Sequence, residues 1–450
     1  MLLPLTLRKN LFRSRSRLRI GGILDGWRPK RRTSEKLDEK SIKDSRNCDG
    51  TRAVLRPAQA LRRHTMRQPK KASPRVEQLE PKLLMSSFYV APTGSDRGIG
   101  SSQAPWLTLQ HAANKVHAGD TVIVEPGTYL GFTLSRSGTA SNPITFESAT
   151  GNPADVIIQA QPNSNTAAAR GITLIAGYII IDGFSVENAP SDGIIIGRPN
   201  DTVRNSVLYH NGWGITNPDQ HGGEGIMVAG LGNDAQLLNN RAYDNREHGI
   251  YISMGADRSL IIGNYLYNNG DATLGRGSGL QVNADGFYWP SVGAVIEQNI
   301  VHDNVNNGFS FQGLQDSLIA NNVVYGNHSP MAVIVAKGSM DNSFVNNTVI
   351  SNPTSASTIC KAIDIGLSGN YPPNTGNQFF NNILVAVGGI PLAFQSANPP
   401  AASDFNFFWA GLNRPIVLND KTFQSWSFAQ WQGAGFDQHS LVGDPLFVAP

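Results

Sequence analysis

His248 and Tyr251 lie three residues apart in the segment His-Gly-Ile-Tyr. Imidazole and phenol groups can each accept and donate a proton, so the pair suits a general base and a general acid. The spacing leaves open which residue takes which role. A solvent-exposed histidine with no chemical task is the alternative interpretation. The sequence therefore offers His248 and Tyr251 as one candidate catalytic pair.

Other polar side chains in neighbouring segments suit the binding of a cation or a substrate. The carboxylates of Glu224, Glu247 and Asp285 could share a calcium ion, because calcium prefers oxygen ligands; ordinary surface carboxylates are the alternative. The candidate substrate-binding residues carry amide, cationic or aromatic groups: Gln281, Asn283, Arg246, Arg276, Tyr288, Trp289 and Lys337. Of these, the aromatic pair Tyr288 and Trp289 could stack on a sugar ring.

An internal repeat determines how these side chains are positioned. Seven segments, from VRNSVLYHN to FFNNILVAV, align on a shared asparagine: Asn205, Asn240, Asn264, Asn299, Asn322, Asn347 and Asn382. The spacings of 35, 24, 35, 23, 25 and 35 residues indicate a base period of about 24 with insertions of about 11. A short strand with alternating apolar residues follows in each repeat, as in GIMVAG and GIYISM.

Strands that stack on their equivalents in the next repeat form parallel sheets with a spacing of ~4.8 Å. The apolar residues then form inner columns, and asparagine suits the bends, where its amide can hydrogen-bond from coil to coil. We therefore predict an all-β chain over residues 86–450, folded as a single-stranded right-handed parallel β-helix of about ten coils. Asn240, Asn264, Asn299, Asn322 and Asn347 should form one column.

The two ends of this solenoid have sequences of their own. Leu109, Ala112, Ala113 and Val116 form an apolar helical stripe within the first part, about 88–130. We predict a helix near 107–117 that caps the first coil, and a closing segment at about 403–450. In the middle of the solenoid, adjacent coils place outward side chains ~5 Å apart. Glu224, the His248–Tyr251 pair and the Gln281–Asp285 segment would then surround one site.

The composition excludes several classes of protein. Charged residues make up 16% of the 450 residues, too few for a coiled coil, and no apolar run reaches the ~20 residues of a membrane span. Residues 1–85 contain 23 Lys and Arg against 8 Asp and Glu, a balance of +15, whereas the remaining 14 and 26 give −12. We predict that 1–85 is a disordered basic leader and that the acidic body does not bind nucleic acid.

Residues 76–86, VEQLEPKLLMS, resemble the Leu-Glu-Pro-Arg-x-Leu-Leu segment near the start of many large exported bacterial proteins. In those proteins the segment lies close to the initiator methionine, which makes Met66 a candidate start. Lys82 stands where the family has arginine. The resemblance implies a bacterial protein that is secreted or held at the cell surface.

The body resembles the pectate-lyase-like superfamily of bacterial right-handed β-helix proteins. The opening YVAPTGSD and AGDTVIVEPGTY is similar to family nine pectate lyases, and DFNFFWAG and HSLVGDPLFVAP are similar to the closing segment of such proteins. The resemblance implies β-elimination on an acidic polysaccharide, by a lyase or a C5-epimerase, with calcium as the cofactor to consider. Such an elimination needs a neutralised C6 carboxylate, a base for the C5 proton and an acid for the leaving oxygen.

Several family signatures are missing. The lysine base of family nine corresponds to Gln281, and its calcium-binding aspartates correspond to Glu247, His248 and Tyr251, while Lys337 lies two coils further on. The Asp-Pro-His signature of mannuronan C5-epimerases and the clustered aspartates of polygalacturonase-type hydrolases are not found. A non-catalytic, glycan-binding or surface-associated β-helix is therefore the alternative, and a glycoside hydrolase a weaker one. We expect a monomer with an acidic polysaccharide as its partner.

Overall fold

A computed structural model describes residues 86–160, 169–214, 222–253, 255–284, 289–351, 359–366, 370–395, 398–419, 422 and 424–447. These residues belong to one compact unit, 78–450. The predicted leader, with Met66 and nearly all of the segment at 76–86, lies outside the described residues, as do Asp285 and Tyr288.

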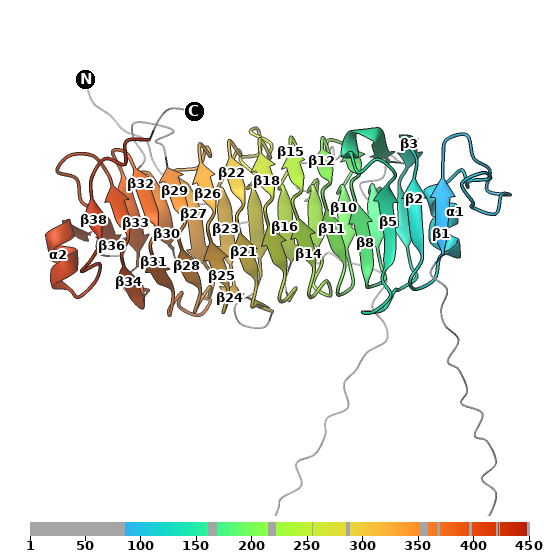
Figure 1. Cartoon of the computed structure of the whole chain (residues 1–450). Helices are drawn as coiled ribbons and strands as arrows, with labels where there is room; N and C mark the ends of the chain where they lie inside the picture. Colours follow the sequence, from blue (N-terminus) through green and yellow to red (C-terminus); the bar gives the residue numbers. More distant parts are fainter. Residues whose placement is uncertain are drawn as a thin grey trace, which may run out of the picture. The chain divides into compact units, whose positions relative to one another are not determined.

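The described part of the chain winds into a solenoid whose three long sheets each contain 12 strands (Figure 1). Sheet 1 consists of β1 (Ser87–Val90), β2 (Thr121–Val124), β5 (Ile144–Ser148), β8 (Ile179–Asp182), β11 (Thr202–Arg204), β14 (Gln236–Leu238), β17 (Leu260–Ile262), β21 (Val295–Glu297), β25 (Leu318–Ala320), β28 (Ser343–Val345), β31 (Gln378–Phe380) and β34 (Ala402–Asp404). Sheet 2 consists of β3 (Gly127–Leu130), β6 (Val156–Gln159), β9 (Ser185–Glu187), β12 (Val207–Tyr209), β15 (Arg241–Tyr243), β18 (Tyr265–Tyr267), β22 (Ile300–His302), β26 (Val323–Tyr325), β29 (Thr348–Ser351), β32 (Ile383–Ala386), β35 (Phe407–Trp409) and β38 (Leu441–Val442).

Sheet 3 consists of β4 (Phe132–Leu134), β7 (Ile172–Leu174), β10 (Ile194–Ile196), β13 (Ile226–Val228), β16 (Ile250–Ser253), β19 (Leu280–Asn283), β23 (Phe309–Gln312), β27 (Met331–Ala336), β30 (Lys361–Ile365), β33 (Ile390–Phe394), β36 (Val417–Asn419) and β37 (Gln424–Trp426). A two-stranded sheet joins β20 (Ser291–Val292) to β24 (Leu314–Gln315). Neighbouring strands of the long sheets are parallel, except that β37 pairs with β36 in the antiparallel direction. The right-handed parallel β-helix is confirmed, with more coils than the predicted ten.

Alternating side chains explain why these short segments form strands. In β16 and β19, Ile250 stands opposite Leu280 and Ile252 opposite Val282, and all four are buried. Tyr251 and Gln281 form the intervening, half-buried pair on the outer face. The same inward columns continue through the solenoid, so one continuous apolar core runs along its axis.

The predicted asparagine column is confirmed. The Asn240 side-chain N–H donates to Asn264 Oδ1. The same side-chain hydrogen bond links Asn264 to Asn299, then Asn322 and Asn347, and the four distances are 2.9–3.1 Å. Each amide also donates to a backbone carbonyl, so these buried groups are satisfied. Asn205 does not join: it takes a left-handed turn, and Ser206 occupies the column position instead.

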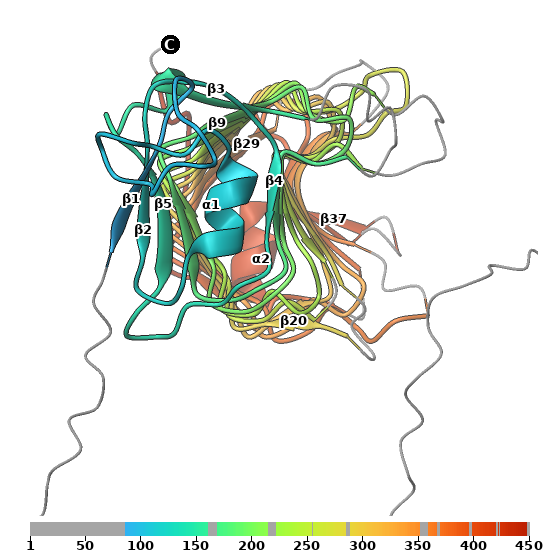
Figure 2. The same cartoon turned by 90° about the vertical axis from the view of Figure 1, so that its right-hand side faces the viewer.

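Helices lie at both ends of the coil stack (Figures 1 and 2). Helix α1 (Leu109–Lys115) begins at Thr108, whose side chain accepts the N–H of His111, and it buries Leu109, Ala112 and Ala113 as predicted. Helix α2 (Phe428–Gly433) begins at Ser427 with a capping box and buries Trp431. A single 3-10 turn, η1 (Pro153–Asp155), precedes β6. Within the described residues, no helix has the length and hydropathy to span a membrane.

Candidate active site

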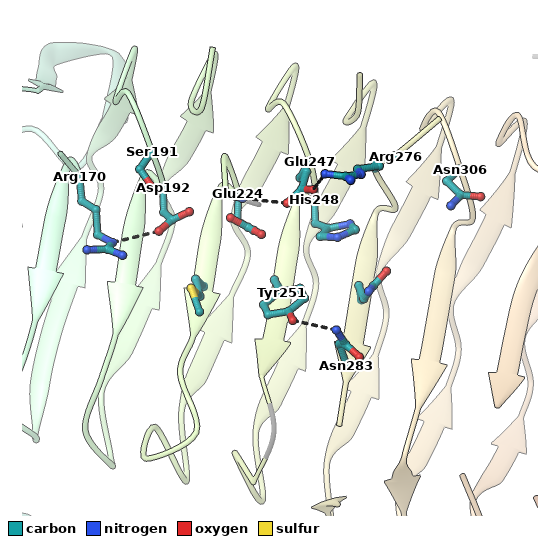
Figure 3. A pocket seen from close by; sticks show the side chains of 14 residues that line it. Arg170, Ser191, Asp192, Glu224, Glu247, His248, Tyr251, Arg276, Asn283 and Asn306 are labelled. Carbon is teal, nitrogen blue, oxygen red and sulfur yellow. Dashed lines mark hydrogen bonds and ion pairs between the residues drawn. The ribbon is translucent and has the colours of Figure 1, made fainter. Parts of the chain in front are cut away.

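A cavity of about 570 Å³ opens over the outer face of sheet 3, at β10, β13, β16 and β19 (Figure 3). It is lined by Arg170, Ser191, Asp192, Gly222, Glu224, Met227, Glu247, His248, Tyr251, Arg276, Gly277, Gln281, Asn283 and Asn306. The structure thus brings together seven of the residues that the sequence singled out: Glu224, Glu247, His248, Tyr251, Arg276, Gln281 and Asn283.

The backbone positions these side chains through a glycine that precedes each of the four strands at the pocket, β10, β13, β16 and β19. The N–H of Gly225 donates to the His248 carbonyl at 2.9 Å, and that of Gly249 to the Ser278 carbonyl at 3.2 Å. A Cβ atom at Gly225 would lie 2.6 Å from a backbone oxygen, so the coils can approach this closely only at glycine. The residue before each glycine is therefore held directly above its counterpart in the next coil.

Two ion pairs flank the row of buried acids in this pocket. Arg170 Nε donates to Asp192 Oδ2 at 2.9 Å, and an Arg276 Nη lies 3.4 Å from Glu247 Oε1. Backbone N–H groups take the remaining carboxylate oxygens, with Gly223 on Asp192 Oδ1 at 3.1 Å and Gly222 on Glu247 Oε2 at 2.9 Å. Asp192 and Glu247 are thus ionised carboxylates with balanced charge.

Glu224 lies between these two carboxylates and behaves differently. Burial, the hydrogen bond to Asp192, and the charges of Asp192 and Glu247 raise the pKa of Glu224 well above its usual value. Burial also opposes ionisation of Asp192, but its hydrogen bonds with Glu224 and Gly223 and its pairing with Arg170 lower the pKa of Asp192. The proton therefore resides on Glu224, and Glu224 Oε2 is buried with no hydrogen-bond partner among the residues that the structure describes.

His248 accepts a hydrogen bond rather than offering a basic nitrogen. The N–H of Ser278 donates to His248 Nδ1 at 2.9 Å, in a fully buried contact. Because Nδ1 accepts, the neutral ring carries its proton on Nε2, and that nitrogen is a donor. The sequence left the base and acid roles of His248 and Tyr251 open; this geometry disfavours His248 as the base.

Tyr251 stacks on the His248 ring, with centroids 5.5 Å apart and an angle of 14° between the planes. The side-chain N–H of Asn283 donates to the Tyr251 hydroxyl oxygen at 3.0 Å. Burial raises the pKa of Tyr251, the Asn283 hydrogen bond opposes this, and the charges of Glu224 and Glu247 add to it. Tyr251 is therefore protonated at neutral pH, with its oxygen supported by an amide.

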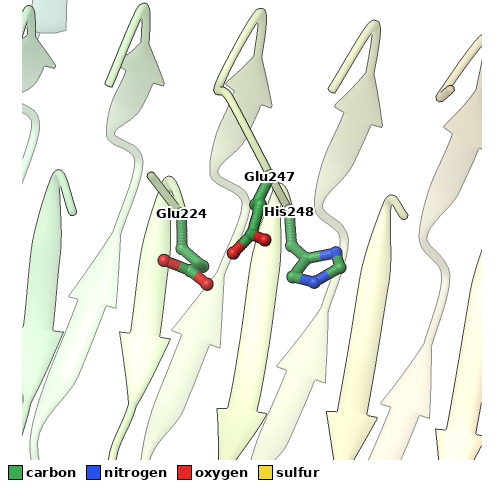
Figure 4. Close-up of side chains that lie close together, drawn as sticks. All are labelled: Glu224, Glu247 and His248. Carbon is green, nitrogen blue, oxygen red and sulfur yellow. The ribbon is translucent and has the colours of Figure 1, made fainter. Parts of the chain in front are cut away.

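The sequence predicted calcium at Glu224, Glu247 and Asp285. In the structure, ligand atoms of Glu224, Glu247 and His248 lie within 4.8 Å of one another (Figure 4). However, both Glu247 oxygens and His248 Nδ1 already accept N–H groups, and Glu224 holds a proton. Calcium takes 6–8 oxygen ligands, so these side chains do not fit that cation.

Three predicted substrate-binding residues lie away from the pocket. Arg246 is 3% exposed and donates to the Gly222 carbonyl, so it packs beneath the pocket wall. Trp289 is exposed, and Lys337 lies in the turn after β27 with its Nζ 5.8 Å from the Tyr371 ring centroid. None of the three lines this cavity, and their contact with a polymer stays a prediction.

The sequence interpretation named Glu224 and Glu247 but missed Arg170 and Asp192, which complete the row of charged residues in the pocket. Asp192, Glu224 and Glu247 lie on three consecutive coils. The alignment that revealed His248 contains the missing signal, because Asp192, Glu224, His248 and Ser278 all precede the same recurring glycine. Arg170 precedes Gly171 in the coil before them, so that position alone would have identified both residues.

Two right-handed β-helix families match this part of the chain. Residues 88–246 match the family described as "Pel9A-like, right handed beta helix region", and residues 170–349 match "Right handed beta helix region". The uncharacterized protein YwoF of Bacillus subtilis is 45% identical over 60 residues, 13% of either chain. Pectate lyase L of Dickeya dadantii is 22% identical over 337 residues, 66% of this chain and 71% of its own.

Among solved structures, pectate lyase Pel9A has the same fold. It superposes with a TM-score of 0.53 and 18% identity over 71% of this chain and 79% of that chain. The superposition shows a shared fold, and at this low identity the activity of this chain does not follow from that of Pel9A.

Proposed function

The chain belongs to the pectate-lyase-like right-handed β-helix proteins, and from this premise we propose that it is an enzyme acting on an acidic polysaccharide by β-elimination. The observation that carries the proposal is the amide-supported Tyr251 hydroxyl beside the donors His248 and Arg276 in one pocket. Because such polymers are extracellular, we also propose that the protein is secreted or displayed at the cell surface.

Elimination moves one proton, and Tyr251 can carry it in both directions. The Tyr251 phenolate takes the C5 proton, the C5–H electrons form the C4=C5 double bond, and the C4–O bond breaks. The tyrosine then gives the proton to the leaving oxygen and returns to phenolate. Asn283 stabilises the negative oxygen by its hydrogen bond. An epimerase would instead return a proton to the opposite face of C5 and leave the C4–O bond intact.

The C5 proton becomes acidic when the C6 carboxylate is neutralised. His248 Nε2–H and the Arg276 guanidinium are the pocket donors suited to that carboxylate, because one is a neutral donor and the other a cation. His248 therefore acts as an electrophilic donor and Tyr251 as the proton carrier.

Glycoside hydrolysis is a second candidate, favoured by the Asp192–Glu224 pair. A buried, protonated carboxyl such as Glu224 is the kind of group that glycosidases use as a general acid. The hydrogen bond between Glu224 and Asp192 holds the two carboxyls closer together than the ~5 Å or more found between a glycosidase's acid and its partner, which makes this candidate the weaker one. In that reaction Glu224 would protonate the leaving oxygen, and no unsaturated sugar would form.

The test is incubation with polygalacturonate, alginate and glucuronan. β-Elimination gives chain cleavage together with ultraviolet absorbance from the unsaturated ring, whereas hydrolysis gives reducing ends without absorbance. Epimerisation changes the uronate composition without cleavage. Tyr251→Phe should lower turnover by ~10²–10⁴-fold, and Tyr243→Phe, on sheet 2, should not. Polymer binding without turnover of any uronan would replace the enzymatic proposal by a binding solenoid.

A further inference from the structure

Arg170 and Arg276 each use a small part of their hydrogen-bonding capacity. Within the described residues, Arg170 donates from Nε to Asp192, and Arg276 donates from one Nη to Glu247. Both side chains line the pocket, and each is 30% exposed. A guanidinium has five N–H donors in a planar fork that matches a carboxylate. The outer edges of both guanidinium groups therefore remain available to a ligand in the pocket.

We propose that Arg170 and Arg276 bind carboxylates of the polymer directly, and that this recognition needs no divalent cation. The inference rests on the proposed action on an acidic polysaccharide and names the groups that recognise its charge.

The charge balance of the pocket supports this assignment. The row Arg170, Asp192, Glu224, Glu247, Arg276 carries two positive and two negative charges, with Glu224 neutral. A buried carboxylate on the inner side fixes each guanidinium in place and limits the entropy that it loses on binding. A calcium ion would have to displace the proton of Glu224 and share the Glu247 and Asp192 oxygens with the N–H groups that already donate to them. Arginine supplies the positive charge without these rearrangements.

The spacing of the two arginines indicates a polymer rather than a single sugar acid. Arg170 precedes β7 and Arg276 precedes β19, and the strand order β7–β10–β13–β16–β19 separates them by four coil steps. At ~4.8 Å per step, their backbones lie roughly 19 Å apart. Each side chain reaches one coil inward, Arg170 to Asp192 and Arg276 to Glu247, and the coils of these two acids are two steps, roughly 10 Å, apart. The two guanidinium groups should therefore contact carboxylates of different sugar residues in one extended chain.

Direct binding of oligouronates in excess chelator tests the inference without relying on turnover. Arg276→Gln and Arg170→Gln should each weaken binding at least tenfold, because hydrogen bonds between charged groups are lost. Arg276→Lys keeps the charge but loses the fork, and should bind at an intermediate strength. Arg258→Gln is the matched control, because it removes the same charge away from the pocket: Arg258 pairs with Asp234 in the turns that precede β17 and β14.

A double variant separates substrate contact from repulsion by an unpaired acid. Arg276→Gln/Glu247→Gln keeps the row balanced and should still bind at least tenfold more weakly than wild type. If chelator abolishes binding and calcium restores it, or if the arginine variants bind as wild type does, the inference is wrong. Absence of an unsaturated product from wild type would refute β-elimination alone, and arginine-dependent binding would still support this inference.

Discussion

Replacing Asp201 by asparagine should make the protein more stable at alkaline pH. Asp201 is fully buried just before β11, and its Oδ1 accepts the Ile179 N–H at 2.9 Å. Its Oδ2 has no hydrogen-bond partner within the described part of the chain. Burial raises the pKa of Asp201 to about 8, against the opposing effect of the Ile179 hydrogen bond. The folded protein therefore holds this carboxyl as a neutral acid through most of the physiological range.

The sign and size of the effect follow from proton linkage. The unfolded chain releases the proton near pH 4, whereas the folded protein keeps it until about pH 8. The stabilisation is complete below the unfolded pKa and is lost as pH rises through the folded pKa. At about 1.4 kcal/mol per pH unit, wild type should lose at most about 4 kcal/mol relative to Asp201→Asn between pH 5 and pH 8.

The residues that precede the other strands of sheet 1, at the coil position of Asp201, show which replacements fit there. Asn342 accepts the Ser317 N–H through its side-chain oxygen, as Asp201 accepts that of Ile179. Serine stands at the equivalent coil position in Ser259 and Ser317. Asp201→Asn and Asp201→Ser therefore both remove the ionisable group at a position that tolerates amide and hydroxyl side chains.

Urea unfolding of the three proteins from pH 5 to pH 9 is the assay. The gap in free energy of unfolding between Asp201→Asn and wild type should widen with pH up to about pH 8 and level off above it, and Asp201→Ser should show the same profile. Parallel stability curves for wild type and both variants would refute the assignment of a neutral, buried acid at this position.

Three further predictions concern the pocket and the asparagine column. Turnover should rise about tenfold per pH unit below the pKa of Tyr251, because the reactive phenolate is scarce while that pKa is raised; a flat kcat profile between pH 6 and pH 9 would contradict the phenolate mechanism. His248→Gln should keep part of the activity that His248→Ala loses, since an amide N–H can replace a donor but not a base; equal loss in steady-state assays would contradict the donor role. Asn299→Ala should cost ~1–3 kcal/mol, because it leaves buried groups of Asn264 and Ile261 without partners; unchanged calorimetric unfolding would contradict the contribution of the asparagine column.

The fold could be predicted from the repeat because each asparagine meets the same physical requirement in its own coil. Asn264 and Asn299 stand at bends where a buried backbone needs an amide partner, so their spacing reports the coil period directly. Asn205 misled the alignment by one residue, since a left-handed turn and a position in the asparagine column both favour asparagine. The alignment placed His248 and Tyr251 on one strand rim, and the structure brings both into the cavity.

The rest of the site depended on facts that spacing does not contain. Arg246 is adjacent to Glu247, yet its side chain turns beneath the wall while that of Glu247 faces the cavity. Which nitrogen of His248 is protonated depends on the Ser278 N–H, a contact across 30 residues. The neutral state of Glu224 depends on burial between two other acids, which required the coils to be stacked first.

The parallel stacking of coils also means that distances along the solenoid axis between equivalent positions change only in whole coil steps. Because each coil hydrogen-bonds only to its immediate neighbours, an additional coil between β7 and β19 could continue the same parallel pairing on both of its sides. The separation of Arg170 and Arg276 would then change by one step of ~4.8 Å and no smaller amount. The coils between the two arginines also carry Asp192, Glu224 and Glu247, so a change in coil number would alter the acid row of the pocket together with the charge spacing along the polymer.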